Sequence, residues 1–314
     1  MAKIVFMGTP DFAQESLKAL YEAGHNIVAV VTNPDRPKGR GMKLVASPVK
    51  EYAVSKELNI LQPEKVRKNE EFLEKIKQME PEYICVVAYG KILPKELLEI
   101  PKKGCINVHG SLLPQYRGAA PIQWSVLNGD KETGITTMYM DEGMDTGDMI
   151  LKEKVDIGED ETTGELWEKL SKIGGNLLVK TIEQIENGTA PREKQQGEFT
   201  MAPMLSKDMA KIDWENMNSV QIKNLVRGLN PIMGAYTTIN DKKVKLWRVQ
   251  LGTKEQEKLV PEVNINRKNG EIIFADDKKG LFVKTKDGML SILELQPENS
   301  KKMTFGEYIR GQRF

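Results

Sequence analysis

The sequence is poor in cysteine and in histidine, with two of each among 314 residues. Cys85 and Cys105 both lie within apolar runs, and neither has the spacing of a metal site or of a CxxC redox pair. We interpret both as buried free thiols and expect no metal centre. Of the two histidines, His25 lies in a helix-to-strand turn, where a role at the helix end is the simpler interpretation.

Long apolar runs are also absent. No stretch approaches the ~20 residues that cross a bilayer, and the strand-like KIVFMG starts at residue 3 without the pattern of a signal peptide. Aromatic residues make up 6% of the chain and charged residues 29%, which is typical of a soluble globular protein. We expect a cytoplasmic protein that does not contact membranes.

The glycines of a dinucleotide-binding loop are missing as well. The first predicted strand runs into MGTPDFA, where Gly8 is the only glycine. A G-x-G-x-x-G loop is needed for a pyrophosphate to approach the start of the following helix closely. The sequence therefore disfavours a nicotinamide-dependent dehydrogenase.

Strand and helix patterns alternate through the first half of the chain. Helical spacing of apolar residues covers 9–24 and 70–81, and Thr162 with Glu165 forms a capping box that opens a helix to about Glu186. The runs that predict strands are residues 3–8, 26–32, 83–88, 105–109 and 135–140. This alternation predicts an α/β, Rossmann-like domain with a mostly parallel sheet and helices on both faces.

The period changes to two near the C-terminus, after a helix predicted at 220–231. Short strands separated by Asp, Asn, Gly and Lys turns are predicted at 235–251, 271–280, 281–290 and 291–296. A small OB-type β-barrel fits this pattern, and another small barrel remains open. We expect a catalytic domain at 1–189, a linker at 190–206 and a C-terminal domain at 207–314.

Charge is unevenly distributed along the chain, although the net charge is only +1. Residues 207–314 hold 20 lysines and arginines against 14 acidic residues, a net +6. A basic loop at 35–43 has a net charge of +3 between prolines and glycines. Both features suit a polyanionic partner, but ordinary variation between domains and a solvated insertion explain them equally simply.

The stretch NVHGSLLP places two polar side chains at the end of a predicted strand. Asn107 and His109 lie two residues apart, so both point to the same side of the sheet, near the carboxyl edge where open α/β sheets bind ligands. An amide and an imidazole that face one oxygen could stabilise an oxyanion, and a histidine can also transfer protons. A hydrogen-bonded core histidine is the alternative.

Acidic residues gather on the glycine-rich loop DEGMDTGD, which follows the strand predicted at 135–140. Asp141, Asp145 and Asp148 are each candidates to orient His109 or to accept a proton. A charged surface loop would have the same composition. The residue pattern leaves both possibilities open.

Three ordered motifs, NVHGSLLP, YRGAAPI and DEGMDTGD, closely resemble the folate-dependent formyltransferases, and MGTPDFA, PDRPKGRG and SPVK resemble the members of that family that act on tRNA. The resemblance implies a formyltransferase domain followed by an OB-like tRNA-binding domain. It also implies transfer of a formyl group from 10-formyltetrahydrofolate to the α-amino group of methionyl initiator tRNA, for translation initiation. No metal is implied.

The resemblance also assigns residues. It places the catalytic set on Asn107, His109 and Asp145, the pterin-pocket wall on residues 86–93, and a tRNA contact on Arg40. It places the folate-contacting turn on Ser111, Leu112, Leu113 and Pro114. Two departures are visible, since Gln115 stands where a basic residue is common and Met144 where leucine is common.

Two other functions remain as rivals. A formyltransferase or formyl hydrolase that acts on a nucleotide sugar, on glycinamide ribonucleotide or on folate would share the first motifs, but would need neither the basic loop nor a basic barrel. A non-catalytic RNA-binding protein would need the barrel, but not Asn107, His109 and Asp145 together. No apolar interface stripe is evident, so we expect a monomer.

Overall fold

The computed structural model describes residues 1–38 and 43–311, and the chain separates into two compact units. Unit 1 comprises Met1–Pro121, Glu132–Asp156 and Trp167–Pro203, and unit 2 comprises Ile122–Lys131, Ile157–Leu166 and the chain from Met204 onward. Two short segments that precede Trp167 in the chain therefore belong to the unit that is built mainly from the residues after Met204. The division at residues 189 and 206 stays a prediction.

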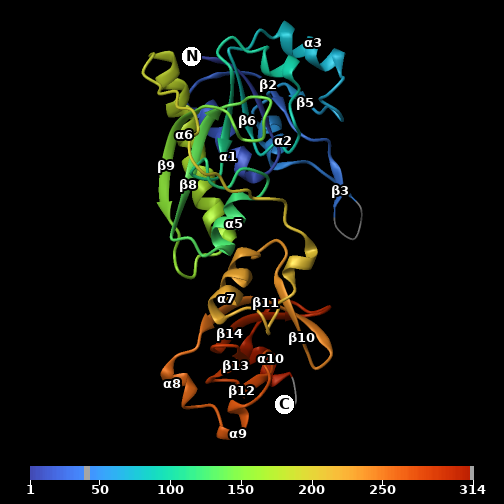
Figure 1. The fold of residues 1–314 in the computed structure, drawn as a ribbon. Coiled ribbons are helices and arrows are strands. Elements are labelled where there is room, and N and C mark those ends of the chain that lie inside the picture. Colours follow the sequence, from blue (N-terminus) through green and yellow to red (C-terminus); the bar gives the residue numbers. More distant parts are fainter. Residues whose placement is uncertain (39–42, 312–314) are drawn as a thin grey trace. The chain divides into compact units, whose positions relative to one another are not determined.

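Unit 1 is built on a sheet of seven strands in the order β5-β2-β1-β6-β7-β8-β9 (Figure 1). These strands are β1 (Lys3–Gly8), β2 (Asn26–Val31), β5 (Ile60–Leu61), β6 (Tyr83–Val87), β7 (Cys105–His109), β8 (Glu132–Tyr139) and β9 (Met149–Asp156). The first five strands of this order pair in parallel, and β8 and β9 are antiparallel. The chain passes from β1 to β2 on one side and later to β6 on the other, so a topological switch point lies between β1 and β6.

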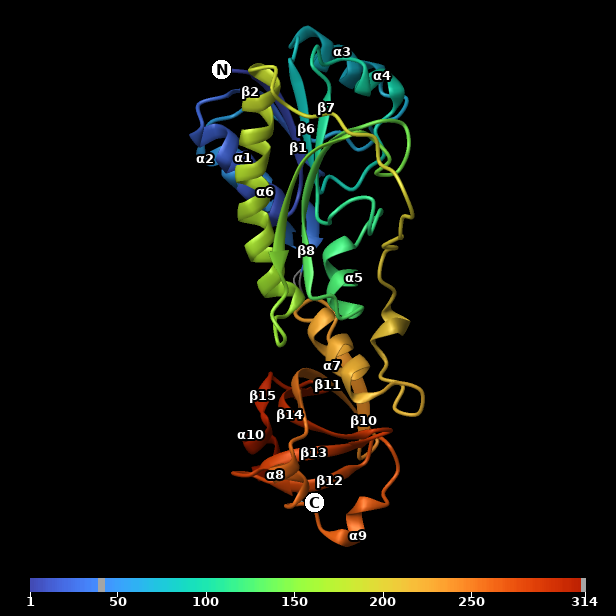
Figure 2. The same ribbon diagram turned by 60° about the vertical axis from the view of Figure 1, so that its left-hand side comes forward.

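Helices cover both faces of this sheet (Figure 2). On one face, α6 (Thr163–Glu186) packs so closely on α1 (Asp11–Glu22) that a Cβ on Gly175 would lie 2.9 Å from the Glu15 carbonyl oxygen. On the other face, α3 (Glu70–Gln78) and α4 (Lys95–Leu98) bury Phe72, Ile76 and Leu97 in one apolar cluster with residues of β1, β2 and β6. The predicted α/β architecture with a mostly parallel sheet is confirmed.

The helix predicted from the Thr162 capping box begins where expected. The Thr162 backbone N–H and hydroxyl both donate to Glu165 Oε2, at 2.8 and 2.7 Å, and α6 runs from Thr163 to Glu186. The sequence did not reveal β9, because residues Lys152 to Lys154 in its centre are charged or exposed. Such a composition is typical of an edge strand, which charged side chains protect from pairing with other chains.

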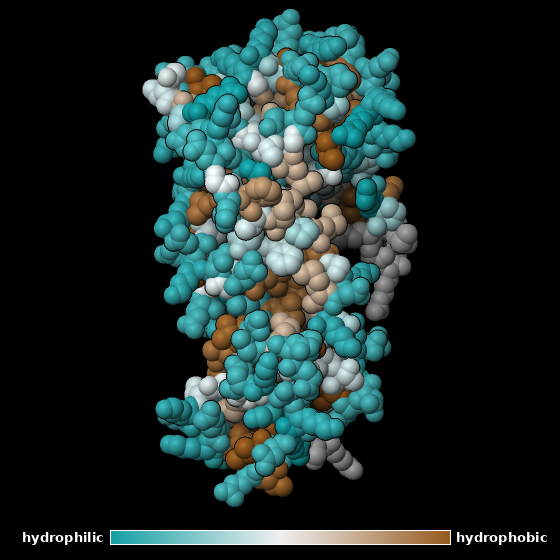
Figure 3. Space-filling model, in the orientation of Figure 1, coloured by the Kyte–Doolittle hydropathy of each residue, from teal (hydrophilic) through white to brown (hydrophobic). Residues whose placement is uncertain are grey.

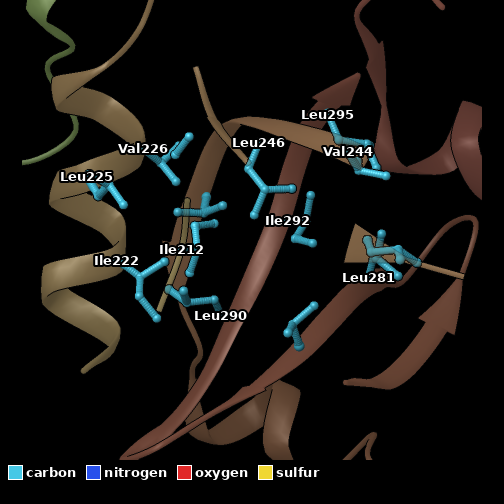
Figure 4. Packing of buried hydrophobic residues seen from close by; sticks show 14 of the residues in the cluster. Ile212, Ile222, Leu225, Val226, Val244, Leu246, Leu281, Leu290, Ile292 and Leu295 are labelled. Atoms are coloured by element: carbon cyan, nitrogen blue, oxygen red, sulfur yellow. The ribbon is translucent and has the colours of Figure 1, made fainter. Parts of the chain in front are cut away.

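Unit 2 contains an antiparallel sheet in the order β10-β11-β14-β13-β12, with β15 paired to β14. The strands are β10 (Ala235–Ile239), β11 (Lys242–Leu251), β12 (Ile272–Asp276), β13 (Gly280–Thr285), β14 (Gly288–Pro297) and β15 (Met303–Thr304), and the helices include α7 (Ser219–Gly228), α8 (Lys254–Glu257), α9 (Glu262–Ile265) and α10 (Phe305–Arg310). Ile222 and Val226 of α7 pack with Leu246, Leu290 and Ile292 of the sheet (Figure 4). The predicted small antiparallel domain after the α/β domain is confirmed.

Hydrophilic residues cover most of the face seen in Figure 3. In the part of the chain that the structure describes, no helix combines the length and the apolar character needed to cross a membrane.

Candidate active site

Asn107 and His109 lie on one face of β7, as their spacing predicts. Val108 between them points to the opposite face, where its Cγ1 would lie 3.0 Å from a Cβ on Gly174 of α6. Strand β7 runs between β6 and β8, with Asn107 opposite Val86 on one side and Met138 on the other. Both polar side chains are buried, with Asn107 9% and His109 5% exposed. They therefore lie in an environment where a hydrogen bond to a ligand is stronger than it is in water.

The two ring nitrogens of His109 face different groups. Nε2 lies 2.8 Å from the Tyr116 carbonyl oxygen, and Nδ1 lies 3.7 Å from Asp145 Oδ2. Because a carbonyl oxygen can only accept a hydrogen bond, Nε2 carries the proton when this bond is made. The Nδ1–Oδ2 separation is longer than a hydrogen bond, so both atoms remain able to contact a third group.

Of the three aspartates on the DEGMDTGD loop, only Asp145 faces His109. Asp141 accepts hydrogen bonds from the Gly143 N–H and the Thr146 hydroxyl, and Asp148 pairs with Arg192 at 2.7 Å. These two carboxylates are therefore occupied by structural contacts. Asp145 is also the residue that the family resemblance assigns, and its catalytic role stays a prediction.

Asp145 is held by its own backbone conformation and by the turn opposite it. Its φ of 54° lies in the left-handed region, which is uncommon for a residue other than glycine. Its Oδ2 accepts a 2.8 Å hydrogen bond from the Gly118 backbone N–H. A Cβ on Gly147 would collide with the Tyr139 carbonyl oxygen, so the loop needs glycine there. The carboxylate is thus fixed from two directions.

The turn predicted to contact folate is tightly bonded to the sheet. The Ser111 hydroxyl donates to the Gln115 carbonyl oxygen at 2.6 Å, and Lys152 donates to the Leu113 carbonyl oxygen at 2.7 Å. Ser111 is fully buried, and Leu113 is 1% exposed in a cluster with Met138 and Met149. Leu112 and Pro114 are half-buried. The side chains of Ser111 and Leu113 thus shape the turn from inside, and the turn's role toward folate stays a prediction.

Residues 86–93, which the resemblance assigns to a pterin-pocket wall, comprise the end of β6 and the turn after it, at the same edge of the sheet. Ala88 and Gly90 both have positive φ, at 44° and 76°, so the chain makes a sharp turn. Tyr89 is 2% exposed, burial raises its pKa to about 12, and its hydroxyl has no hydrogen-bond partner within the described chain. Ile92 is 61% exposed. This segment combines an exposed apolar side chain with an unused buried donor.

The basic loop is anchored at its base. Strands β3 (Arg36–Lys38) and β4 (Lys43–Val45) form a short antiparallel hairpin, and Asp35 at its start accepts hydrogen bonds from Lys50 at 2.6 Å and Gln62 at 2.9 Å. The Lys50 bond is the main cause that lowers the Asp35 pKa. Arg40, the predicted tRNA contact, lies outside the described residues.

Cys85 and Cys105 are both free and buried. Burial raises the Cys105 pKa to about 12 and also raises that of Cys85, so both thiols stay protonated and unreactive at neutral pH. No group of three or more His, Cys, Asp or Glu side chains within residues 1–38 and 43–311 could hold a metal ion.

Comparisons with known proteins show to which family this chain belongs. The formyl transferase model matches residues 2–182, and the model of the formyl transferase C-terminal domain matches residues 204–313. The chain belongs to the formyl transferase family. This confirms the resemblance seen in the three motifs of the N-terminal half.

Relatives within the family match along nearly their whole length. The methionyl-tRNA formyltransferase of Clostridioides difficile is 51% identical over 98% of this chain and 96% of its own, and that of Caldanaerobacter subterraneus is 48% identical with the same coverage. Among solved structures, HypX from Aquifex aeolicus in complex with tetrahydrofolic acid superposes with a TM-score of 0.63 at 15% identity, over 98% of this chain and 46% of its own. This last likeness shows the fold.

Several contacts to the candidate site come from the segment after α6, and no pattern in the sequence predicts them. Gln195 and Thr200 hydrogen-bond to residues of the YRGAAPI and DEGMDTGD motifs. They lie in a stretch without periodicity, within the predicted linker at 190–206. A pattern of polar residues in such a stretch does not distinguish a solvated linker from one that packs on a site.

Proposed function

We propose that the protein transfers the formyl group of 10-formyltetrahydrofolate to the α-amino group of methionyl initiator tRNA, in the cytoplasm and for translation initiation. The observation that carries the proposal is the pairing of His109 with Asp145 beside Asn107, in a chain that is about half identical to methionyl-tRNA formyltransferases over nearly its full length. These three side chains suit the transfer of an acyl group to an amine.

The reaction forms one C–N bond and breaks another. The neutral amine attacks the formyl carbon, and the carbonyl oxygen becomes an oxyanion in a tetrahedral intermediate. The bond from the formyl carbon to N10 of the folate then breaks, and the proton lost by the amine ends on N10. The products are the formylated aminoacyl-tRNA and tetrahydrofolate, and no oxidant or reductant is consumed.

Asn107 and His109 stabilise the oxyanion, while Asp145 positions His109 and helps to move the proton of the amine. Since His109 Nε2–H donates to the Tyr116 carbonyl oxygen, the ring donates to the formyl oxygen through Nδ1 after Nδ1 has taken the proton that the attacking amine loses, and that proton then passes to N10. Nδ1 and Asp145 Oδ2 are 3.7 Å apart, so a substrate atom or a water can contact both. The hydrogen bond from Nε2 to the Tyr116 carbonyl oxygen fixes the orientation of the His109 ring during these steps.

The folate lies against the segments that follow β6 and β7. These strands are neighbours in the parallel part of the sheet, so residues 88–93 and 110–114 leave the same edge. The exposed Ile92 and the half-buried Leu112 and Pro114 offer apolar contacts for a ring, and the Tyr89 hydroxyl is an unused donor. The residues present thus fit a flat heterocycle that carries polar edges.

Charged and aromatic side chains support the tRNA as the acceptor. In the C-terminal domain, Lys243 lies 3.8 Å from the Tyr236 ring centroid, and Lys245 and Lys302 lie within 6 Å of the Trp247 ring. Lysines beside aromatic rings suit a nucleic-acid strand, which offers both phosphates and bases. We assign formyl transfer to residues 1–189 and tRNA binding to Arg40 and to residues 207–314 of a monomer.

A formylation assay tests the proposal. The wild-type protein should transfer formyl groups to methionine-charged initiator tRNA and act far more slowly on charged elongator tRNA. The Asn107→Ala variant should lose about a hundred- to a thousandfold in kcat, since one lost oxyanion donor costs ~2.7–4 kcal/mol, with little change in folate affinity. Asn187→Ala, at an exposed position at the end of α6, is the matched control. A variant of Asn107 that only weakens folate binding would contradict this assignment.

A further inference from the structure

Residues 190–203, which follow α6, form a strap that bonds to the candidate active site. The Arg117 N–H donates to the Thr200 carbonyl oxygen at 2.9 Å, and the Ala202 N–H donates to the Arg117 carbonyl oxygen at 2.7 Å. Gly118 has a φ of 123°, and a Cβ there would lie 2.8 Å from the Ala202 carbonyl oxygen. The strap therefore lies directly against the turn that also contacts His109 and Asp145.

Gln195 is the member of this strap that reaches both sides of the site. Its Nε2 donates to the backbone carbonyl oxygens of Asp145 at 2.7 Å and of Gly147 at 3.0 Å. Its Oε1 accepts from Arg117 Nε at 3.0 Å and from Arg117 Nη2 at 2.7 Å. Both N–H donors and both lone pairs of the amide are thus used.

The two segments that Gln195 connects are those that face the two ring nitrogens of His109. Tyr116, directly before Arg117, supplies the carbonyl oxygen at Nε2, and Asp145 supplies the carboxylate opposite Nδ1. Arg117 is itself held, because its guanidinium stacks 4.6 Å from the centroid of the Phe199 ring on the same strap. Gln195 therefore fixes the spacing between the two groups that orient one imidazole.

We propose that Gln195 is a positioning residue for formyl transfer, which holds the Asp145 backbone so that its carboxylate faces His109. The inference rests on the proposed function, and Gln195 itself acts through Asp145 rather than on the substrate. Asp145 needs such support because its left-handed backbone conformation is costly for a residue other than glycine. Two hydrogen bonds from one amide to the carbonyl oxygens of Asp145 and Gly147 offset that cost.

Two variants separate the donor half of Gln195 from its acceptor half. Gln195→Met removes all four hydrogen bonds at nearly constant volume. Gln195→Glu keeps an acceptor for Arg117, but offers a carboxylate to two carbonyl oxygens. Both variants should lose about ten- to a hundredfold in kcat on methionyl initiator tRNA, by analogy with the loss found when a partner that orients a metal-ligating side chain is removed. The KM for 10-formyltetrahydrofolate should change less than about threefold, because binding does not depend on the proton transfer.

Gln196→Met is the matched control, since Gln196 is the next residue and is exposed. It should keep wild-type kcat and KM. The ring NMR signals of the two histidines give an independent readout. Those of His109 should move in Gln195→Met, while those of His25, which lies in a turn before β2, should not.

The outcomes are distinct. A wild-type protein without formyl transfer to methionyl-tRNA would overturn the proposed function, whatever the variants do. With an active wild type, unchanged kcat in Gln195→Met, or wild-type kcat in Gln195→Glu, would overturn the positioning role. An unmoved His109 signal in Gln195→Met, or a loss confined to KM, would overturn it as well.

Discussion

Replacing Arg227 by methionine is expected to destabilise unit 2 by about 3–5 kcal/mol. Arg227 lies on α7 and is 7% exposed. Its guanidinium donates to the carbonyl oxygens of Gly158 at 3.2 Å and Glu161 at 3.1 Å, and to Asn224 Oδ1 at 2.9 Å. It thereby joins the segment 157–166 to the helix that covers the sheet of the same unit.

The size of this destabilisation follows from the hydrogen-bond acceptors that the substitution leaves without a donor. Methionine fills most of the volume but donates nothing, so two carbonyl oxygens and an amide oxygen lose their partner. A buried unsatisfied acceptor such as Asn224 Oδ1 costs about 1–3 kcal/mol, and the Gly158 carbonyl oxygen costs less, because this residue is exposed and water can replace the guanidinium there. Burial also lowers the Arg227 pKa, and nearby Asp160 opposes this effect. The loss of ~4 kcal/mol is a large part of the roughly 5–15 kcal/mol that stabilises a typical domain.

Urea unfolding followed by tryptophan fluorescence measures this effect. Three of the four tryptophans, Trp124, Trp214 and Trp247, belong to unit 2, so the signal reports mainly on that unit. With an m value of about 2 kcal/mol/M, the midpoint should fall by about 2 M. Arg310→Met is the control, because its side chain is 59% exposed and its ion pair is long at 3.5 Å. A loss below about 1 kcal/mol in the Arg227 variant would refute the reasoning.

Three further outcomes are expected. Arg40→Ala should weaken the use of initiator tRNA in the formylation assay and leave folate binding intact, whereas Lys65→Ala, at an exposed position, should change neither. Leu290→Ala should lower the free energy of unfolding by about 2–5 kcal/mol in urea titrations, because Leu290 is fully buried in the cluster of Figure 4. Burial lowers the His25 pKa, and its Nδ1 accepts from the Ala2 N–H at 3.3 Å, so the unfolded chain takes up a proton first. The melting temperature should therefore fall as pH drops below about 6.5, and His25→Gln should reduce this fall.

The local part of the site could be predicted from the sequence. Alternation along a strand places Asn107 and His109 on one face without knowledge of the rest of the fold. The alternation of strands with helices also predicts a mostly parallel sheet and the edge at which the site lies. These inferences need only neighbours in the chain, which is why the structure agrees with them.

The choice among the three aspartates could not be made locally. Asp141, Asp145 and Asp148 differ by which partner each finds, and two of them find partners that are distant in sequence, Arg192 for Asp148 and Gly118 for Asp145. The family resemblance supplied the choice of Asp145 instead. The resemblance does not give side-chain directions. It assigns Ser111 to folate contact, while in the structure the Ser111 hydroxyl donates a hydrogen bond within the turn.

The strap shows that a boundary between domains drawn from the sequence can leave out residues that contact the candidate site. The two matched family domains end at residue 182 and begin again at 204, and Gln195 and Thr200 lie in the gap. A segment without periodicity has no internal reason to adopt one conformation, so its order must come from what it touches. Here it touches the Arg117 turn and the Asp145 loop, through Gln195 and through backbone bonds to residues 200 and 202. A change of length within residues 195–202 would displace these contacts, and its first consequence would fall on formyl transfer rather than on the reach between the two domains.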